Sequence, residues 1–454
     1  MIQTNIMIYG TEENRRETEC ARFVLNYLEK HGAQARVTLN KGCINSICIL
    51  NGKTDRLQMS NDRALTIQVY YKNRYGNFST NRLEKDELEK FADNALRATM
   101  FVEEDLARAL PERELYYRGD NPDLGQSDSS IFTITDERKK EIAVEVCSSM
   151  EGNRYLVSAE SEYNDYLDYQ YIIDSQGFEA HSVQTDFDVC AQCSVRNGGD
   201  ARYESYWYES AMHFNELDYK RCGIVALERG IAKFNPVKAR SGKYNMIIEN
   251  CCASRVVSPI INGLNGSLIQ QKNSFLAGSL GKRVFGENVT FKDQPHRYGM
   301  AGSRYFDSEG IATKEMTFIE NGIINNYFID SYYSRKLNMP VTAESPSVPE
   351  LVCCNKSEGE FQGTAELMRE MDSGILVTGF NGGNCNGATG DFSYGIEGFR
   401  FRGGKIIHPV REMNITGNVV SLWNNLALAG KDPQKWAKWQ IPSLAFENIN
   451  FNGK

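Results

Sequence analysis

The spacing of apolar residues predicts a helix near each end of the first hundred residues. Between Thr11 and Gly32 they recur every three or four positions, as on one helix face, with Thr11 as the N-cap and Gly32 just past the C-terminus. The second helix is expected from 85 to 101. The two apolar faces are Cys20, Ala21, Val24, Leu25 and Leu28, and then Leu88, Phe91, Ala92, Ala95, Leu96 and Thr99.

Between these helices the period shortens to two, which is typical of strands. Residues 47–60 are expected to form short strands that fold over Asn51 and Gly52, because that dipeptide favours a tight hairpin turn. Residues 65–80 supply further short strands. We therefore expect an N-terminal α+β domain over 1–117, followed by a linker rich in Gly, Pro, Asp and Ser at 118–130.

Tyrosine is concentrated in a central region, 118–235. Aromatic side chains favour sheets, so we interpret these residues as strand faces, and a binding platform is the alternative. The residues are Tyr163, Tyr166, Tyr169 and Tyr171, then Tyr203, Tyr206, Trp207 and Tyr208. A helix is expected over 217–234, with an apolar face of Ile224, Val225, Leu227 and Ile231.

The remaining residues, 236–454, are predicted to form a β-rich domain. A strand is expected to begin at 241–244, and two later stretches are expected to fold as hairpins, over Asn321 with Gly322 and over Gly403 with Gly404. The predicted fold class is α+β: an N-terminal α/β domain of helices and hairpins followed by a β-dominated C-terminal domain.

Charge and length exclude some classes of function. The 454 residues carry a formal net charge of −8, which argues against direct binding of nucleic acid. The N-terminus lacks the apolar run of a signal peptide, and no apolar stretch approaches about 18 residues. We expect a cytoplasmic protein without membrane contact.

The twelve cysteines are interpreted as buried, reduced thiols. They are spread along the chain, and without an export signal disulfides are not expected. Cys190 and Cys193 form a CxxC pair, but the surrounding residues alternate like a strand, so we interpret the pair as structural and not as a redox or zinc site.

Local motifs for catalysis are weak. No two of the five histidines lie within ten residues of each other, so the sequence contains no local histidine pair for a metal. Cys385 with His408 is the single nucleophilic pair that we consider, and an incidental cysteine is the alternative.

The glycine-rich stretch 379–391 contains no P-loop pattern. Its glycines are suited to close backbone approach, as the edge that binds an extended peptide requires, although a phosphate cradle is the alternative. The peptide-binding candidates are Gly263, Gly382, Gly383, Asn384 and Asp391.

The stretch 256–281, which contains the run Gly263, Leu264, Asn265 and Gly266, resembles the central segment of the PmbA/TldD family. Metal-bearing members carry the zinc motif HExxxH directly before GLEG. Three further blocks, beginning at Lys272, Phe306 and Gly379, also match, and the likeness is greatest to the PmbA/TldE branch, which lacks the zinc motif.

The resemblance places the lost zinc motif on Val257, Ser258 and Asn262. A valine has no lone pair, and the other two side chains are poor zinc ligands. The third family ligand is a cysteine near the C-terminus, and this chain has none after Cys385. The alternatives for Ser258 and Asn262 are that they line a used pocket or that they cap and pack a helix.

Three hypotheses follow. The first, which the resemblance implies, is a non-catalytic subunit without metal or other cofactor, which forms a dimer, pairs with a zinc-bearing TldD-like subunit and holds a peptide or unfolded protein for cleavage. The second is a hydrolase that acts alone through a non-metal nucleophile such as Cys385. The third is a regulatory binding protein of the gyrase-modulator type.

Overall fold

The computed structural model describes residues 12–119, 121–353 and 359–453. It divides the chain into two compact units. Unit 1 consists of Met1–Ala232, Tyr298–Met300 and Phe306–Ala312, and unit 2 consists of Lys233–Arg297, Ala301–Tyr305 and Thr313–Lys454.

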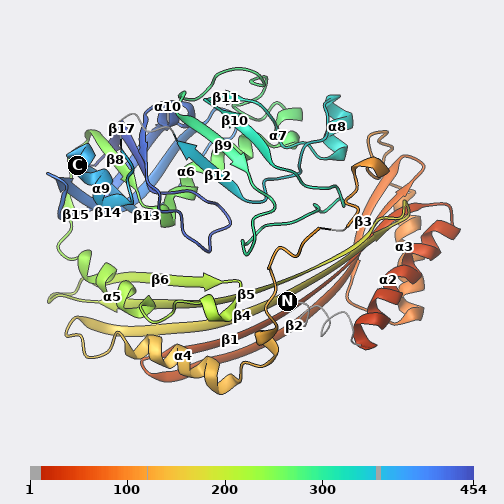
Figure 1. Cartoon of the computed structure of the whole chain (residues 1–454), viewed down its shortest axis with the longest axis horizontal. Helices are drawn as coiled ribbons and strands as arrows, with labels where there is room; N and C mark the ends of the chain where they lie inside the picture. The colour runs from red at the N-terminus through yellow and green to blue at the C-terminus, as the bar shows by residue number, and fades with distance from the viewer. Residues whose placement is uncertain (1–11, 120, 354–358, 454) are drawn as a thin grey trace. The chain divides into compact units, whose positions relative to one another are not determined.

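Unit 1 is built on a six-stranded antiparallel sheet with the order β3-β2-β1-β4-β5-β6, drawn in Figure 1 as long, curved strands. The strands are β1 (Gln34–Leu50), β2 (Lys53–Tyr71), β3 (Arg74–Thr80), β4 (Leu156–Asp174), β5 (Glu179–Val195) and β6 (Tyr203–Ala211). The α-helices are α2 (Glu12–Lys30), α3 (Lys85–Thr99), α4 (Asp136–Ser148) and α5 (Cys222–Ala232), with short 3-10 turns at Arg113–Leu115, Ser129–Phe132 and Phe214–Glu216.

The predicted hairpin over Asn51 and Gly52 is confirmed, because both residues have positive φ, 49° and 75°, as a type I′ turn requires. The prediction of short strands is wrong: β1 and β2 have 17 and 19 residues. Polar residues at the centre of β1 interrupt the apolar alternation, but β2 and β4 pair with β1 through that stretch.

Both predicted N-terminal helices are present. Gly32 has φ +78° and follows α2 as predicted, whereas Thr11 lies outside the described residues. The apolar faces of α2 and α3 pack into one core with β1, β2 and β4. Helix α4 was not predicted from the sequence.

The predicted apolar face of the third helix is only partly right: α5 lies within 217–234 and Leu227 is buried, but the other three predicted residues are exposed or only half-buried. Ile224 is exposed, and the side that packs inward contains two glycines. A Cβ atom on Gly223 would lie 2.4 Å from the carbonyl oxygen of Val146 in α4, so the two helices approach too closely for a larger side chain. The buried residues are Cys222, Gly223, Ala226, Leu227 and Gly230.

The regions 1–117 and 118–235, which the sequence analysis treats separately, contribute to the same sheet. The stretch between them is also bound to it. Thr185 of β5 donates its backbone N–H to the carbonyl of Gln126, and Asp128 accepts from the backbone of Phe214.

A buried network of one ion pair and several hydrogen bonds connects distant segments of unit 1. Arg36 and Asp174 form an ion pair at 3.3 Å with almost no solvent exposure. Asp174 also accepts from the Tyr116 hydroxyl at 2.6 Å, and the Arg36 guanidinium donates to the carbonyl of Glu309 at 2.6 Å. Because a buried charge is costly without its partner, these four segments depend on one another.

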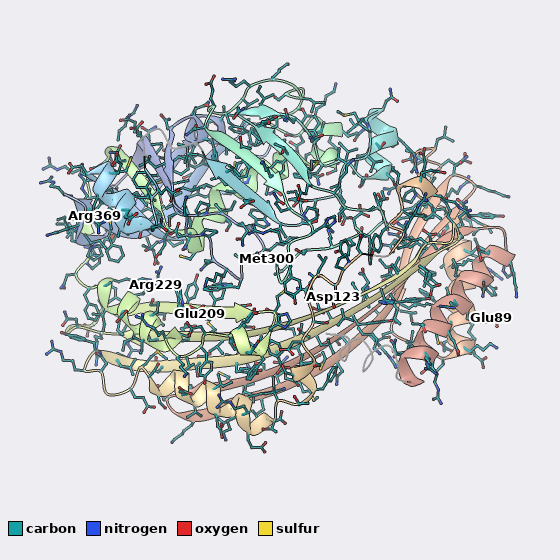
Figure 2. The ribbon with its side chains drawn as sticks, viewed as in Figure 1. Glu89, Asp123, Glu209, Arg229, Met300 and Arg369 are labelled. Carbon is teal, nitrogen blue, oxygen red and sulfur yellow. The ribbon has the colours of Figure 1, made fainter. Side chains whose placement is uncertain are left out.

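The tyrosine-rich stretches lie on strands β4 and β6, which confirms their interpretation as strand residues. Tyr163 is fully buried, whereas Tyr206 is exposed. Figure 2 labels two residues that flank Trp207: Arg229 stacks over its ring at 5.0 Å, and Glu209 accepts its indole N–H at 2.7 Å. The binding-platform alternative stays a prediction.

Unit 2 contains two sheets. The first has the order β16-β17-β8-β13-β14-β15-β7 with an additional β15–β17 pairing, and the second has the order β11-β10-β9-β12. The first sheet's strands are β7 (Val237–Lys238), β8 (Gly242–Ile248), β13 (Ser373–Cys385), β14 (Asp391–Arg402), β15 (Lys405–Asn418), β16 (Leu426–Ala429) and β17 (Leu444–Asn452). Those of the second are β9 (Val289–Asp293), β10 (Met316–Glu320), β11 (Ile323–Ile324) and β12 (Pro349–Cys353).

The helices of unit 2 are short. They are α6 (Asn250–Gly263), α7 (Gly266–Gln270), α8 (Ser331–Leu337), α9 (Thr364–Met371) and α10 (Val419–Asn424). One apolar core joins α6 to strands of both sheets. Both predicted hairpin turns, at 321–322 and 403–404, have positive φ and join antiparallel strands. The α+β fold class with a strand-rich C-terminal region is confirmed.

The structure bears on two further expectations, the state of the cysteines and the presence of membrane-spanning helices. The ten cysteines whose side chains the structure describes have free thiols, and Cys190 and Cys193 lie on β5 as predicted. None of the helices in these ranges combines the length and the hydrophobicity that a membrane-spanning helix requires.

Asp188, on strand β5 of the unit 1 sheet, has a carboxyl group whose charged form is disfavoured by burial. Burial raises the pKa of Asp188 to about 6, and the charge of Asp186 adds to the effect, although Asn164 donates to Asp188 at 3.1 Å and opposes it. The folded state therefore favours protonated Asp188. Its contribution to stability is fully present below the unfolded pKa, near 3.8, and is lost as pH rises through about 6.

We expect Asp188→Asn to stabilise the protein at pH 8 by up to about 3 kcal/mol, because the neutral amide avoids the cost of burying a charge. At pH 4 the two proteins should differ little. Thermal unfolding at both pH values measures the difference, and Asp200→Asn, at an exposed loop position, is the control. A gain at pH 4 as large as that at pH 8 would contradict this explanation.

Candidate functional site

Helix α6 presents the three positions of the lost zinc motif to different surroundings. Val257 is fully buried in the core of unit 2, Ser258 is half-buried, and Asn262 is exposed. These side chains do not form a donor set that fits zinc, since one has no lone pair and the others offer only a neutral hydroxyl and a neutral amide. Within the described ranges, no group of three or more His, Cys, Asp or Glu is placed to hold a metal ion.

The position of α6 is fixed by apolar packing and by one buried hydrogen bond. Val256, Val257 and Ile260 are at most 1% exposed. Pro259 stands inside the helix and has no N–H to continue the ladder. The indole of Trp423, itself fully buried on α10, donates to the carbonyl of Val256 at 3.1 Å and ties the two helices together.

The two glycines after α6 allow close approach of neighbouring segments. A Cβ atom on Gly263 would lie 3.1 Å from the Phe275 ring, and one on Gly266 would lie 2.9 Å from the carbonyl oxygen of Phe328. Between them Asn265 caps α7 by accepting from the backbone of Ser267 at 2.9 Å. The Gly263–Gly266 run is therefore a tightly packed turn.

The glycine-rich hairpin between β13 and β14 lies against this turn. Phe275 donates its backbone N–H to the carbonyl of Gly387 at 2.9 Å, and its ring contacts Gly390. The structure thus brings together two stretches, near 263 and near 387, that the sequence analysis names separately as peptide-binding candidates.

Gly383 lies in a bulge of β13 and has φ +90°. A Cβ atom there would lie 1.9 Å from the carbonyl oxygen of Ser393 on the paired strand. On its other side, Arg255 of α6 donates to the Gly383 carbonyl at 2.7 Å and stacks over the Tyr394 ring at 4.8 Å. Gly383 therefore joins the hairpin to α6.

One edge of the β13 tip is open. In the described part of the chain, β13 pairs with β8 only at Ile375–Val377, whereas its pairing with β14 continues to Cys385. The residues along this open edge, from Asn381 to Asn384, are exposed. An extended peptide can pair with such an edge through main-chain hydrogen bonds.

Asp391, at the start of β14, is an exposed carboxylate at the base of the loop. Its oxygens accept from the Thr389 hydroxyl at 2.8 Å and from the Asn418 amide at 3.0 Å. The Asn418 bond, and then the Thr389 bond, lower the pKa of Asp391, so the group stays negatively charged at neutral pH.

Cys385 and His408 are not brought together. Cys385 is opposite Phe392 on β14, and His408 is opposite Arg400, eight positions further along the same strand, which separates them by roughly 25 Å. Burial raises the pKa of the Cys385 thiol, and the Tyr394 hydroxyl opposes this only in part. A thiol with a raised pKa and no nearby histidine is a poor nucleophile.

The sequence analysis missed Arg255 and Tyr394. Arg255 is exposed on α6, and its two contacts lie more than a hundred residues away in the chain, so only the folded structure reveals them. The sequence offers one local signal, and only for Arg255: it lies two residues before Val257, the first position of the lost motif.

Comparison with known proteins gives consistent matches. Family models described as "PmbA/TldA metallopeptidase domain 1" and "PmbA/TldA metallopeptidase C-terminal domain" match residues 35–99 and 241–453. The metalloprotease PmbA homolog of Haemophilus influenzae is 26% identical over 437 residues, which cover 96% of each chain.

Solved structures extend these matches. A proposed modulator of DNA gyrase from Bacteroides thetaiotaomicron is 39% identical, covers 98% of this chain and 100% of its own, and superposes with a TM-score of 0.92. TldE from Thermococcus kodakarensis is 15% identical, with coverage of 96% and 100% and a TM-score of 0.79, and shares the fold.

We expect Gly383→Ala to destabilise unit 2 far more than Gly382→Ala. Both glycines have positive φ, but only at Gly383 does a Cβ atom collide with the backbone, whereas nothing lies within 4 Å of the Cβ position at Gly382. The added clash should cost about 2 kcal/mol or more beyond the strain that the two share. Thermal unfolding of the two variants tests this, and equal losses would contradict it.

Proposed function

This chain belongs to the PmbA/TldD family of metallopeptidases, and we propose that within it the chain is a zinc-free, PmbA/TldE-like subunit that works beside a zinc-bearing TldD-type partner. In this role it helps to hold peptide or unfolded protein substrates, and the partner supplies the metal for hydrolysis. The chain itself then takes no direct part in breaking the bond.

The observation that carries this proposal is the character of α6. The first ligand position of the family motif is a valine with no solvent exposure, and the motif's glutamate position is a serine. Hydrolysis by zinc needs a metal-bound water and a base that takes its proton. Val257 and Ser258 supply neither a ligand nor a base.

The open edge of β13 supports a role in holding substrate. Main-chain pairing along residues 381–384 does not depend on the side chains of the peptide, which suits a subunit that accepts varied unfolded sequences. Gly263, Gly382, Gly383 and Asn384 form or support this edge, and the ionised Asp391 offers a contact for a positively charged group of the substrate.

A regulatory role directed at gyrase is the second candidate. It is favoured by the description of the Bacteroides relative as a proposed modulator of DNA gyrase. With a net charge of −8, the chain would act on a protein partner and not on DNA. Recovery of gyrase, and not of a TldD-type chain, in a pull-down with the purified protein would favour this candidate.

The zinc-free proposal predicts that the purified chain holds no stoichiometric zinc and leaves an unfolded peptide intact, whereas a mixture with a TldD-type subunit cleaves it. Elemental analysis measures the metal, and mass spectrometry follows the peptide. The partner alone is the control that separates assistance by this chain from the partner's own activity. Stoichiometric zinc in this chain, or cleavage without a partner, would contradict the proposal.

The same proposal predicts that Cys385→Ala leaves the cleavage rate of the mixture unchanged, since the thiol has a raised pKa and lies far from His408. A metal chelator, in contrast, should lower the cleavage rate of the mixture, because hydrolysis depends on the partner's zinc. A chelator-resistant activity that disappears in Cys385→Ala would establish the nucleophile hypothesis instead.

A further inference from the structure

Arg255 of α6 lies beside the open edge of β13 and uses few of its hydrogen-bond donors. Its guanidinium donates one N–H to the carbonyl of Gly383 at 2.7 Å and stacks over the Tyr394 ring at 4.8 Å. The side chain is nevertheless exposed, and an arginine carries five N–H donors. The two contacts therefore hold the guanidinium at the edge and leave N–H groups for a further acceptor.

The main chain next to Arg255 is suited to pairing with an extended peptide. A register shift in the β13–β14 ladder leaves Asn381 and Gly382 outside the sequence of paired residues. A Cβ atom on Gly382 would meet no heavy atom of the described chain within 4 Å, so there is space beside this stretch. Because Arg255 contacts the adjacent Gly383, a peptide that pairs here passes within reach of the guanidinium.

The positive charge of Arg255 is not neutralised by a carboxylate of the described ranges. The two carboxylates on β14 have other partners: Glu397 pairs with Lys233 at 2.7 Å, and Asp391 accepts from Asn418 of β15 at 3.0 Å. The contacts of Arg255 are a neutral carbonyl and an aromatic ring. A planar guanidinium matches the two oxygens of a carboxylate, so this is the ligand group that the position fits.

We propose that Arg255 is a specificity-determining residue of the β13 edge and binds a carboxylate of the paired peptide. The group comes from the C-terminus of the peptide or from an aspartate or glutamate side chain. This inference rests on the substrate-holding role proposed above. It goes further because it names the chemical group that is recognised and the residue that recognises it. A C-terminal carboxylate is present on every peptide, so its recognition does not depend on sequence.

Binding of peptides to the purified full chain tests the proposal. One neutral sequence, labelled at its N-terminus, is prepared with a free C-terminal carboxylate, with a C-terminal amide, and as the amide with one glutamine replaced by glutamate. Fluorescence anisotropy measures the three Kd values. We expect a carboxylate-bearing peptide to bind roughly tenfold more tightly than the neutral amide, because a charge-assisted pair is stronger than a neutral one. The peptide that gains affinity identifies the source of the carboxylate.

Substitutions assign the preference to one side chain. In Arg255→Gln the neutral and the carboxylate-bearing peptides should bind equally, and in Arg255→Glu the neutral peptide should bind more tightly. Arg400→Gln is the matched control and should keep the preference. Arg400 makes the same two kinds of contact at the other end of β13, to the carbonyl of Gly374 at 3.1 Å and over the Tyr244 ring at 4.7 Å.

The ratio of the Kd values separates recognition from a structural role. If Arg255 only holds the hairpin to α6, Arg255→Gln weakens the binding of all three peptides alike and leaves the ratio unchanged. That result, or equal binding of the three peptides by the unmodified chain, would overturn the proposal and leave the zinc-free subunit role in place. An unmodified chain that binds none of the peptides would contradict the substrate-holding role, and this proposal with it.

Discussion

The packing of α6 into the core is the constraint on which the rest of unit 2 depends. The helix follows β8 directly, and its buried face contacts residues from both sheets. It cannot rotate without exposing Val256, Val257 and Ile260, which would cost about 1.5 kcal/mol or more for each side chain. The polar positions on its other faces are therefore fixed in direction.

Because α6 is fixed in this way, replacing a single side chain would not restore a zinc ligand on it. A histidine at position 257 would place a polar ring in a fully apolar core, where an unsatisfied group costs a few kcal/mol. The same burial that excludes a metal ligand holds α6 firmly enough for Arg255 to reach the carbonyl of Gly383. The rigid helix thus positions the edge of the neighbouring hairpin.

Local rules predicted local features. The turns at 51–52, 321–322 and 403–404 are readable because each needs positive φ and contains Gly or Asn, which tolerate it. The turn between β2 and β3 was not readable, since one of its two positive-φ residues is Lys72. The buried face of α5 was partly misread because glycine carries no hydrophobic signal, although a Cβ atom on Gly223 or Gly230 would lie within 3.1 Å of a neighbouring segment.

The candidate site depends on contacts that no local pattern contains. Arg255 and Gly383 are 128 residues apart, and Phe275 reaches Gly387 across more than a hundred residues. The sequence named several of the residues that line this region, but their meeting depends on the parallel pairing of β8 with β13, which sets where α6 lies against the hairpin. Strand pairing at such separation is a property of the whole fold.

An edge that binds through main-chain groups has a particular consequence for a two-subunit peptidase. Hydrogen bonds from residues 381–384 would be made equally by a bound peptide and by its transition state, so they would lower KM and leave kcat unaffected. The contribution to kcat must then come from the subunit that holds the metal. A chain with an open strand edge and a buried valine at the position of the family's first ligand fits this proposed division.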